Sequence, residues 1–366
     1  MALTSMAVAK GSAGAVLEID LGAIVANWRA LVARHPTGPV AAVVKADAYG
    51  LGAQDVVPAL HAAGCRHFFT ALPDEALAVR NLVPGAMLAV LDGLFPGAAR
   101  DYVAHDLVPA LGSLPEIEAW MRAARDAGRA LPAILHVDTG MARLGLSPGE
   151  LARLPSLAGL RLLYVMTHLV SAEERDNDLN LVQRRRFDAA CAMLPAAPRS
   201  LANSSGIFLP GFGSDLARPG AALYGVNPTP GQPNPMRLPL RLRARVLAVR
   251  DIAAGETVGY NATWRAARPS RIATAAIGYA DGFLRSQSNR GAALFDGKPL
   301  PLVGRVSMDL TTFDATAHAA LAPGDWLDLI GPGRTPDDLA AAAGTNGYEI
   351  LTALGRRFHR VHTPAS

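Results

Sequence analysis

The sequence contains only two cysteines, Cys65 and Cys191, and neither belongs to a CxxC pair. It therefore indicates neither a disulfide framework nor a zinc site, and we expect no metal. No uninterrupted apolar run reaches about 18 residues, so we expect no membrane-spanning helix and no membrane partner. The net charge is only +4, and no basic run is interleaved with aromatic residues, so nucleic acid is not an expected partner. The apolar stretch in the first dozen residues is too short for a secretory signal, which predicts a loose leader and a cytoplasmic location.

Hydrophobic residues, in contrast, make up 50% of the 366 residues and supply enough material for large cores. A chain of this length suits two domains better than one. The amino-acid composition changes after Gly225. The segment VNPTPGQPNPMRLP is rich in proline and asparagine, which is typical of a linker. We therefore predict one domain over residues 14–236 and a second over residues 237–366.

The first domain is predicted to be a (β/α)8 TIM barrel of the α/β class. Helical patterns such as 115–127 and 178–193 separate short apolar strand candidates at 39–45, 67–71, 87–91, 107–111, 133–138, 162–167 and 200–203, and an eighth of ambiguous register falls within 215–226. This alternation indicates a parallel sheet that is buried on both faces. About eight such units over roughly 200 residues fit a barrel. The alternative is an open doubly wound sheet. The sequence has no GxGxxG motif after the first strand to support it.

The C-terminal domain is predicted to be mostly β. LRLRARVLAV at 240–249 alternates apolar residues with arginine, which is the pattern of a strand with one face in water. Further strands are expected at 270–277, 299–308 and 325–330, and short helices from Pro336 and at 347–354. At the other end of the chain, Asp20 is expected to cap an amphipathic helix.

Polar residues follow several predicted barrel strands at their carboxyl ends, where the active sites of such barrels lie. The first strand is followed by Lys45, the sixth by His168, the seventh by Asn203 and Ser204, and the eighth contains Arg218, Gly220 and Ala221. Each alone is most simply a surface or core residue, but several polar groups at one rim of a barrel indicate a site.

These residue types predict pyridoxal 5'-phosphate as the cofactor. A lysine at the rim of a buried sheet is suited to form a Schiff base with an aldehyde, and Lys45 has that place. Barrels commonly bind phosphate with the loops after strands 7 and 8. Ser204 offers a hydroxyl there, and the backbone at Gly220 and Ala221 allows close approach.

Eight short motifs occur along the chain, in the order VKADAYG (44–50), VDTGMARLG (137–145), MTH (166–168), ANS (202–204), RPG (218–220), GY (259–260), IGYADG (277–282) and GRVSMD (304–309). In type and order they resemble the motifs of the alanine racemases, pyridoxal-phosphate enzymes built from a barrel and a β domain. The resemblance extends from about residue 15 to the C-terminus. Together the motifs are highly specific, although each alone is weak.

The resemblance implies interconversion of L-alanine and D-alanine by two bases in a homodimer with shared active sites. Lys45 would hold the cofactor and act as one base, and Tyr260 of the partner subunit would act as the other. Two bases on opposite faces of the α-carbon move the proton directly. Because a phenol has a pKa of about 10, this tyrosine needs nearby positive charge or a hydrogen bond.

The resemblance also assigns the remaining contacts of cofactor and substrate. Arg218 would face the pyridine nitrogen with support from His168, and its permanent charge would disfavour protonation of that nitrogen. The other implied roles are phosphate binding by Tyr49, Ser204 and the backbone at Gly220, binding of the substrate carboxylate by Arg143 and the partner's Met308, and a place in the entryway for Arg285.

Three sites depart from the family pattern. Leu51, in YGLG, stands where the family often has histidine, and we expect this difference to have little effect. His136 stands where many members carry a carbamylated lysine that positions the arginine equivalent to Arg143. We therefore expect no carbamate and no dependence on bicarbonate, a lowered pKa if His136 faces Arg143, and another acceptor for that arginine, such as chloride or Asp138. Gly355 and Arg356 stand about where some members carry an entryway tyrosine.

Other functions on the same scaffold stay open at this point. A racemase of serine, lysine or several amino acids shares every motif, and a decarboxylase of the related barrel family fits Arg218 and Tyr260 less well. A non-catalytic pyridoxal-phosphate carrier would share the barrel and its lysine but not the β domain. The sequence does not separate cell-wall supply of D-alanine, a peptidoglycan precursor, from alanine catabolism.

Overall fold

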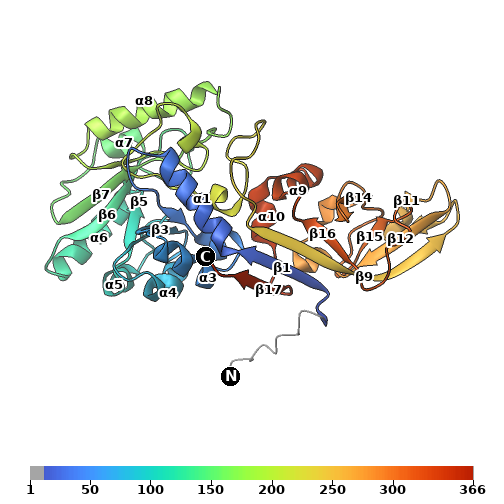
Figure 1. Ribbon diagram of the computed structural model, residues 1–366. Helices are drawn as coiled ribbons and strands as arrows, with labels where there is room; N and C mark the ends of the chain where they lie inside the picture. Colours follow the sequence, from blue (N-terminus) through green and yellow to red (C-terminus); the bar gives the residue numbers. More distant parts are fainter. Residues whose placement is uncertain (1–11, 366) are drawn as a thin grey trace. The chain divides into compact units, whose positions relative to one another are not determined.

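The computed structural model describes residues 12–365, which divide into two compact units (Figure 1). One unit is Ile24–Arg237, and the other joins Leu238–Ser366 to the N-terminal segment that ends at Ala23. The expected boundary between residues 236 and 237 lies one residue from this division, but residues 14–23, expected in the barrel, belong to the other unit. The segment 1–11, interpreted as a leader, lies outside the described residues. Between residues 12 and 365, no helix is long and apolar enough to cross a membrane.

The first unit contains a curled parallel sheet of seven strands in chain order. The strands are β2 (Ala42–Val43), β3 (His67–Thr70), β4 (Met87–Val90), β5 (Val108–Leu111), β6 (Leu131–His136), β7 (Leu160–Met166) and β8 (Arg199–Ser200). Each pairs in parallel with the next, which confirms the seven strand candidates.

The irregular segment 216–219 takes the place of the eighth barrel strand. It lies within the range expected for that strand. Its carbonyl groups accept hydrogen bonds from Ala41 (2.9 Å) and Val43 (3.0 Å) beside β2. Its amides donate to the carbonyls of Arg199 (3.2 Å) and Ala202 (2.8 Å) beside β8. Proline at position 219 has no amide to donate, which limits regular pairing here. The segment therefore closes the barrel without forming a regular strand.

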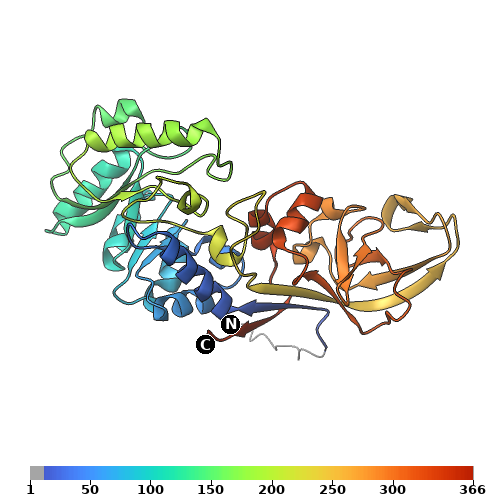
Figure 2. The same cartoon turned by 45° about the horizontal axis from the view of Figure 1, so that its top comes forward.

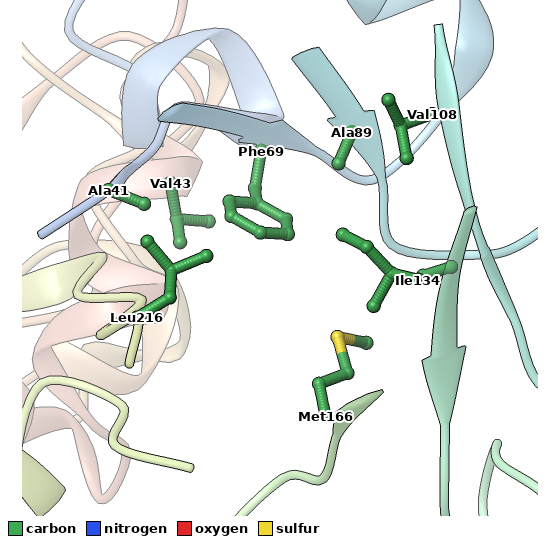
Figure 3. Packing of buried hydrophobic residues seen from close by; sticks show 9 residues of the cluster. Ala41, Val43, Phe69, Ala89, Val108, Ile134, Met166 and Leu216 are labelled. Carbon is green, nitrogen blue, oxygen red and sulfur yellow. The ribbon is translucent and has the colours of Figure 1, made fainter. Parts of the chain in front are cut away.

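Apolar side chains from all sides of this barrel fill its interior (Figure 3). The buried cluster consists of Ala41, Val43, Phe69, Ala89, Val108, Ala110, Ile134, Met166 and Leu216. A barrel of this size has a packed core and no open channel, so the polar residues after the strands gather at the end of the barrel.

Helices lie on the outer side of the sheet (Figures 1 and 2). They are α1 (Leu21–Arg34), α3 (Ala53–Ala62), α4 (Pro73–Val79), α5 (Ala99–Ala104), α6 (Leu114–Asp126), α7 (Pro148–Leu151) and α8 (Asp178–Ala192). The expected cap of α1 is confirmed, because the Asp20 carboxylate accepts the Ala23 amide at 2.9 Å. The predicted helices at 115–127 and 178–193 correspond to α6 and α8.

The second unit is mostly β, as expected, and its longest strand is β9 (Leu240–Ile252). Strand β1 (Ala15–Asp20) pairs antiparallel with β9 and parallel with β17 (His359–Thr363). The other elements are β10 (Thr257–Val258), β11 (Trp264–Arg265), β12 (Ser270–Ala275), β13 (Ala292–Phe295), β14 (Lys298–Pro301), β15 (Thr311–Asp314), β16 (Trp326–Ile330), α9 (Pro336–Ala343) and α10 (Gly347–Ala353).

One predicted strand of this unit, at 299–308, is only partly present. Strand β14 ends at Pro301, and the chain then turns through Gly304 at φ 80°. A β-carbon at Gly304 would lie 2.9 Å from the Val258 carbonyl oxygen. The glycine thus permits both a left-handed backbone and a close approach, and both interrupt the strand.

Candidate active site

Lys45 lies two residues after the end of β2, at the start of a left-handed turn. The next four residues, 46–49, all have φ between 52° and 55°, and Gly50 follows at φ 80°. Hydrogen bonds from the Ala48 amide to Val44 (2.9 Å) and from the Gly50 amide to Ala46 (2.8 Å) close the turn. For residues with a β-carbon this conformation costs about 1–2 kcal/mol each, so surrounding contacts must impose it.

Two carboxylates hold this turn. Glu75 accepts the amide of Ala46 at 2.6 Å with one oxygen, and the amides of Ala71 (2.9 Å) and Leu72 (3.2 Å) with the other. Asp47 accepts the Ala53 amide at 2.7 Å. Sequence reasoning missed Glu75, although its place at the third position of α4 is typical of a capping carboxylate.

Ser204 lies at the centre of a cradle of donors after the last strands. Its hydroxyl oxygen accepts the amides of Gly220 (3.0 Å) and Ala222 (3.3 Å). Asn203 accepts the Gly206 amide at 2.9 Å, which fixes the loop that presents this serine. The structure therefore brings together the hydroxyl and the backbone that the sequence proposed for phosphate binding.

Tyr49 completes this cradle from the left-handed turn. A β-carbon at Gly220 would lie 2.2 Å from the Tyr49 hydroxyl oxygen, so only glycine allows the two to meet. The Tyr49 ring stacks on Tyr224 with ring centroids 4.8 Å apart, and the Tyr224 hydroxyl donates to the Val43 carbonyl at 2.9 Å. Burial raises the pKa of Tyr49 to about 12, so its phenol stays neutral and can donate a hydrogen bond to an anion.

Arg218 is a buried cation with only 5% of its surface exposed. Its guanidinium donates to the Ser200 hydroxyl (2.5 Å) and the Thr167 carbonyl (2.6 Å), and no carboxylate in residues 12–365 forms an ion pair with it. Burial lowers its pKa to about 10, which leaves it charged at neutral pH. An uncompensated buried cation favours an electron-rich ligand.

Two neutral histidines lie near this cation. Burial and then the charge of Arg218 lower the pKa of His168 to about 3, and the same two causes, in the same order, lower the pKa of His136 to about 4. The expected decrease at His136 is confirmed, although burial rather than Arg143 is its main cause. The His136 Nδ1 atom is buried and has no hydrogen-bond partner among the described residues.

Arg143 lies on a loop that Asp138 organises. One Asp138 oxygen accepts the amides of Gly140 and Met141, both at 2.9 Å, and the other accepts the Ala142 amide at 3.0 Å. This carboxylate binds the loop backbone, and no ion pair joins it to the guanidinium of Arg143 in residues 12–365, so the suggested contact between the two is not formed here. Arg143 itself is exposed, and its charge contributes to the lowered pKa of both histidines.

The remaining predicted site residues belong to the second unit and lie on its surface. Tyr260 is 67% exposed and follows Gly259, which has φ 75°. Met308 is 54% exposed, and its carbonyl accepts the Ala280 amide at 3.0 Å. Arg285 is exposed at the start of a short 3-10 helix.

Comparisons with known proteins match both units of the chain. The family model of the alanine racemase N-terminal domain matches residues 19–228, and that of the C-terminal domain matches residues 239–362. An alanine racemase of Acidiphilium cryptum is 60% identical over 350 residues, which are 94% of this chain and 98% of that protein. A catabolic alanine racemase of Mesorhizobium japonicum is 48% identical over 366 residues, 98% of this chain and 96% of that protein.

Solved structures give the same result. A Bartonella henselae alanine racemase with covalently bound pyridoxal phosphate has 41% sequence identity and a TM-score of 0.92, and the match covers 96% of this chain and all of that one. A biosynthetic alanine racemase of Pseudomonas aeruginosa has 35% identity and a TM-score of 0.90, with 96% of this chain and 99% of that chain covered.

Proposed function

The chain belongs to the alanine racemase family, and from this premise we propose how its own residues carry out the pyridoxal-phosphate-dependent interconversion of L-alanine and D-alanine. The observation that carries the proposal is the cradle of Ser204, Tyr49 and the Gly220 backbone beside the Lys45 turn. Its donors are uncharged, and Arg218 adds one buried positive charge nearby. This set of groups fits a phosphorylated pyridine aldehyde.

Three groups of the cofactor, the aldehyde, the phosphate and the ring nitrogen, each have a partner among these residues. Lys45 would hold the aldehyde carbon, Ser204, Tyr49 and the backbone at Gly220 and Ala221 would hold the phosphate, and Arg218, beside the neutral His168, would face the ring nitrogen. When bound, pyridoxal phosphate withdraws electron density from the α-carbon of the amino acid and weakens its bond to hydrogen. Because Arg218 keeps its charge, it disfavours a proton on the ring nitrogen and so limits side reactions such as transamination.

The proton is moved by two side chains on opposite faces of the α-carbon. The Lys45 Nζ atom takes or returns it on one face, and the phenolic oxygen of Tyr260 of the partner subunit does so on the other, where it takes the proton as a phenolate and returns it as a phenol. Arg143 and the backbone of the partner's Met308 bind the substrate carboxylate, and Arg285 lies at the entryway. Two observations support a shared site in a homodimer: Lys45 and Tyr260 belong to separate units, and Tyr260 and Met308 are exposed.

A cytoplasmic location stays a prediction, and the family assignment fits both supply of D-alanine for peptidoglycan and alanine catabolism, since similar proteins are named catabolic and biosynthetic. Within this function, alanine is preferred over serine and lysine. Racemisation rates measured across a panel of L-amino acids test this preference directly.

The assignment of Lys45 is tested by Lys45→Ala, with Lys298→Ala on the exposed strand β14 as the matched control. We expect Lys45→Ala to lose the visible absorbance of the lysine-bound cofactor and to lower racemisation of L-alanine by about a hundredfold or more. The control should keep both. A Lys45→Ala protein that retains the lysine-bound absorbance would show that another residue holds the cofactor.

A further inference from the structure

Arg357 joins two loops of the second unit through two carboxylates. Its Nε atom lies 3.0 Å from Asp281 Oδ1, and its Nη1 atom lies 2.8 Å from Asp309 Oδ1. The Asp281 side chain is only 7% exposed, whereas about half of the Arg357 and Asp309 side chains is exposed. The motifs IGYADG and GRVSMD, which contain these two aspartates, are thus tied together by a residue outside both.

The two loops also form a short backbone ladder. The Tyr279 amide donates to the Ser307 carbonyl and the Ala280 amide to the Met308 carbonyl, both at 3.0 Å. The second oxygen of Asp281 accepts the Gly278 amide at 2.9 Å. Arg357 therefore binds one end of this pair of loops, and the backbone hydrogen bonds between the loops position Met308.

The C-terminal segment reaches these loops because of two glycines. Gly282 has φ 92°, and a β-carbon there would lie 1.9 Å from the Ala353 carbonyl oxygen. The Gly355 amide donates to the Asp281 carbonyl at 2.9 Å. Close contact between the end of α10 and the IGYADG loop thus brings Arg357 to both carboxylates.

We propose that Arg357 is a positioning residue for racemisation, which acts through Asp281 and Asp309 on the Met308 backbone. This inference rests on the proposed function, in which that backbone binds the substrate carboxylate of the partner's site. Two guanidinium nitrogens bind two carboxylates at once, which the single ammonium group of lysine does less well. Arg268, between β11 and β12 of the same unit, is exposed, and its side chain has no hydrogen bond or ion pair with any described residue.

The test compares Arg357→Gln, Arg357→Lys and the matched control Arg268→Gln in the holoenzyme. We expect Arg357→Gln to raise the KM for L-alanine about tenfold with a change in kcat of less than about threefold. Arg357→Lys should give an intermediate KM, because it retains charge near both aspartates. Arg268→Gln removes the same charge and should change neither constant more than about twofold.

A second measurement, amide hydrogen exchange, follows the loops without relying on activity. Exchange at Tyr279 and Ala280 should accelerate about tenfold in Arg357→Gln but not in Arg268→Gln. Equal KM values in the two glutamine variants, or a lower kcat at unchanged KM, would overturn the inference while the racemase function stands. Unchanged exchange in Arg357→Gln would overturn it as well. A failure of the proposed function is distinct, because wild type itself would then not racemise L-alanine.

Discussion

At the scale of single residues, the end of the barrel combines one permanent cation with two histidines that stay uncharged. Arg218 is buried without a carboxylate partner in the described chain, and it lies close enough to His168 and His136 to lower the pKa of both. A second buried cation beside the guanidinium would be costly, so both imidazoles remain neutral at physiological pH. The site is therefore positive enough for an anionic ligand and avoids the repulsion of several adjacent charges.

This arrangement predicts that the free energy of unfolding falls as the pH decreases from 6.5 to 5.0. His136 has a pKa of about 4 in the folded chain and about 6.5 when unfolded, so the unfolded state binds more protons in this interval and acid favours it. For His136 the loss is about 1.5 kcal/mol. His168 adds a loss of the same sign. Denaturant titrations at both pH values should show a smaller loss in His136→Asn than in wild type.

His105, which is exposed at the end of α5, provides the matched control. His105→Asn should lose as much stability between the two pH values as wild type does. If His136→Asn and wild type lose equal amounts, the histidine does not titrate as its burial implies.

Single residues at strand ends were well predicted from the sequence, whereas their partners were not. Lys45, Ser204 and Gly220 could be located because a parallel barrel brings the carboxyl ends of its strands together. Glu75 and Arg357 act through contacts that depend on the folded chain, and neither follows an apolar strand. The sequence shows which residues lie at the rim, but not the contacts by which Glu75 holds the Lys45 turn and Arg357 joins two loops of the second unit.

At the scale of elements, the left-handed turn at 46–49 is the feature furthest from what local sequence favours. Ala-Asp-Ala-Tyr contains no glycine, and such residues prefer the right-handed region. The Glu75 carboxylate, 29 residues away in the chain, accepts the Ala46 amide and so stabilises the turn from outside. Because this contact is between distant segments, the sequence alone indicated only that Lys45 ends a strand.

We predict that Glu75→Gln loosens this turn and impairs catalysis. The amide group of glutamine has one acceptor oxygen, so either the Ala46 amide or the pair at Ala71 and Leu72 would face a donor. Stability should fall by about 1–2 kcal/mol, and kcat/KM for L-alanine by about tenfold. Denaturant titration and steady-state kinetics measure the two effects.

Asp74→Asn is the matched control, since Asp74 is the exposed acid next to Glu75 in the first turn of α4. It should leave kcat/KM within about twofold of wild type. Wild-type kinetics in Glu75→Gln would show that the turn does not need this carboxylate.

At the scale of the whole molecule, the chain crosses between its two units. It begins with β1 in the second unit, forms the barrel, and returns to the second unit at Leu238. The sequence showed the linker near this return but not the earlier crossing, because an apolar strand at 15–20 pairs with β9 more than 200 residues later. One unit holds Lys45 and the other holds Tyr260, so each unit carries one of the two proposed bases.

This division predicts that two inactive variants restore activity when their subunits exchange. Lys45→Ala lacks one base and Tyr260→Phe lacks the other. In a random mixture half of the dimers are mixed, and one of the two sites in each mixed dimer has both bases. We therefore expect activity to rise to about a quarter of the wild-type value. Exchange must be verified independently, for example with two affinity tags, before the L-alanine assay. If verified mixed dimers recover no activity, the two bases of a site do not come from two different subunits. The proposed shared site would then be wrong.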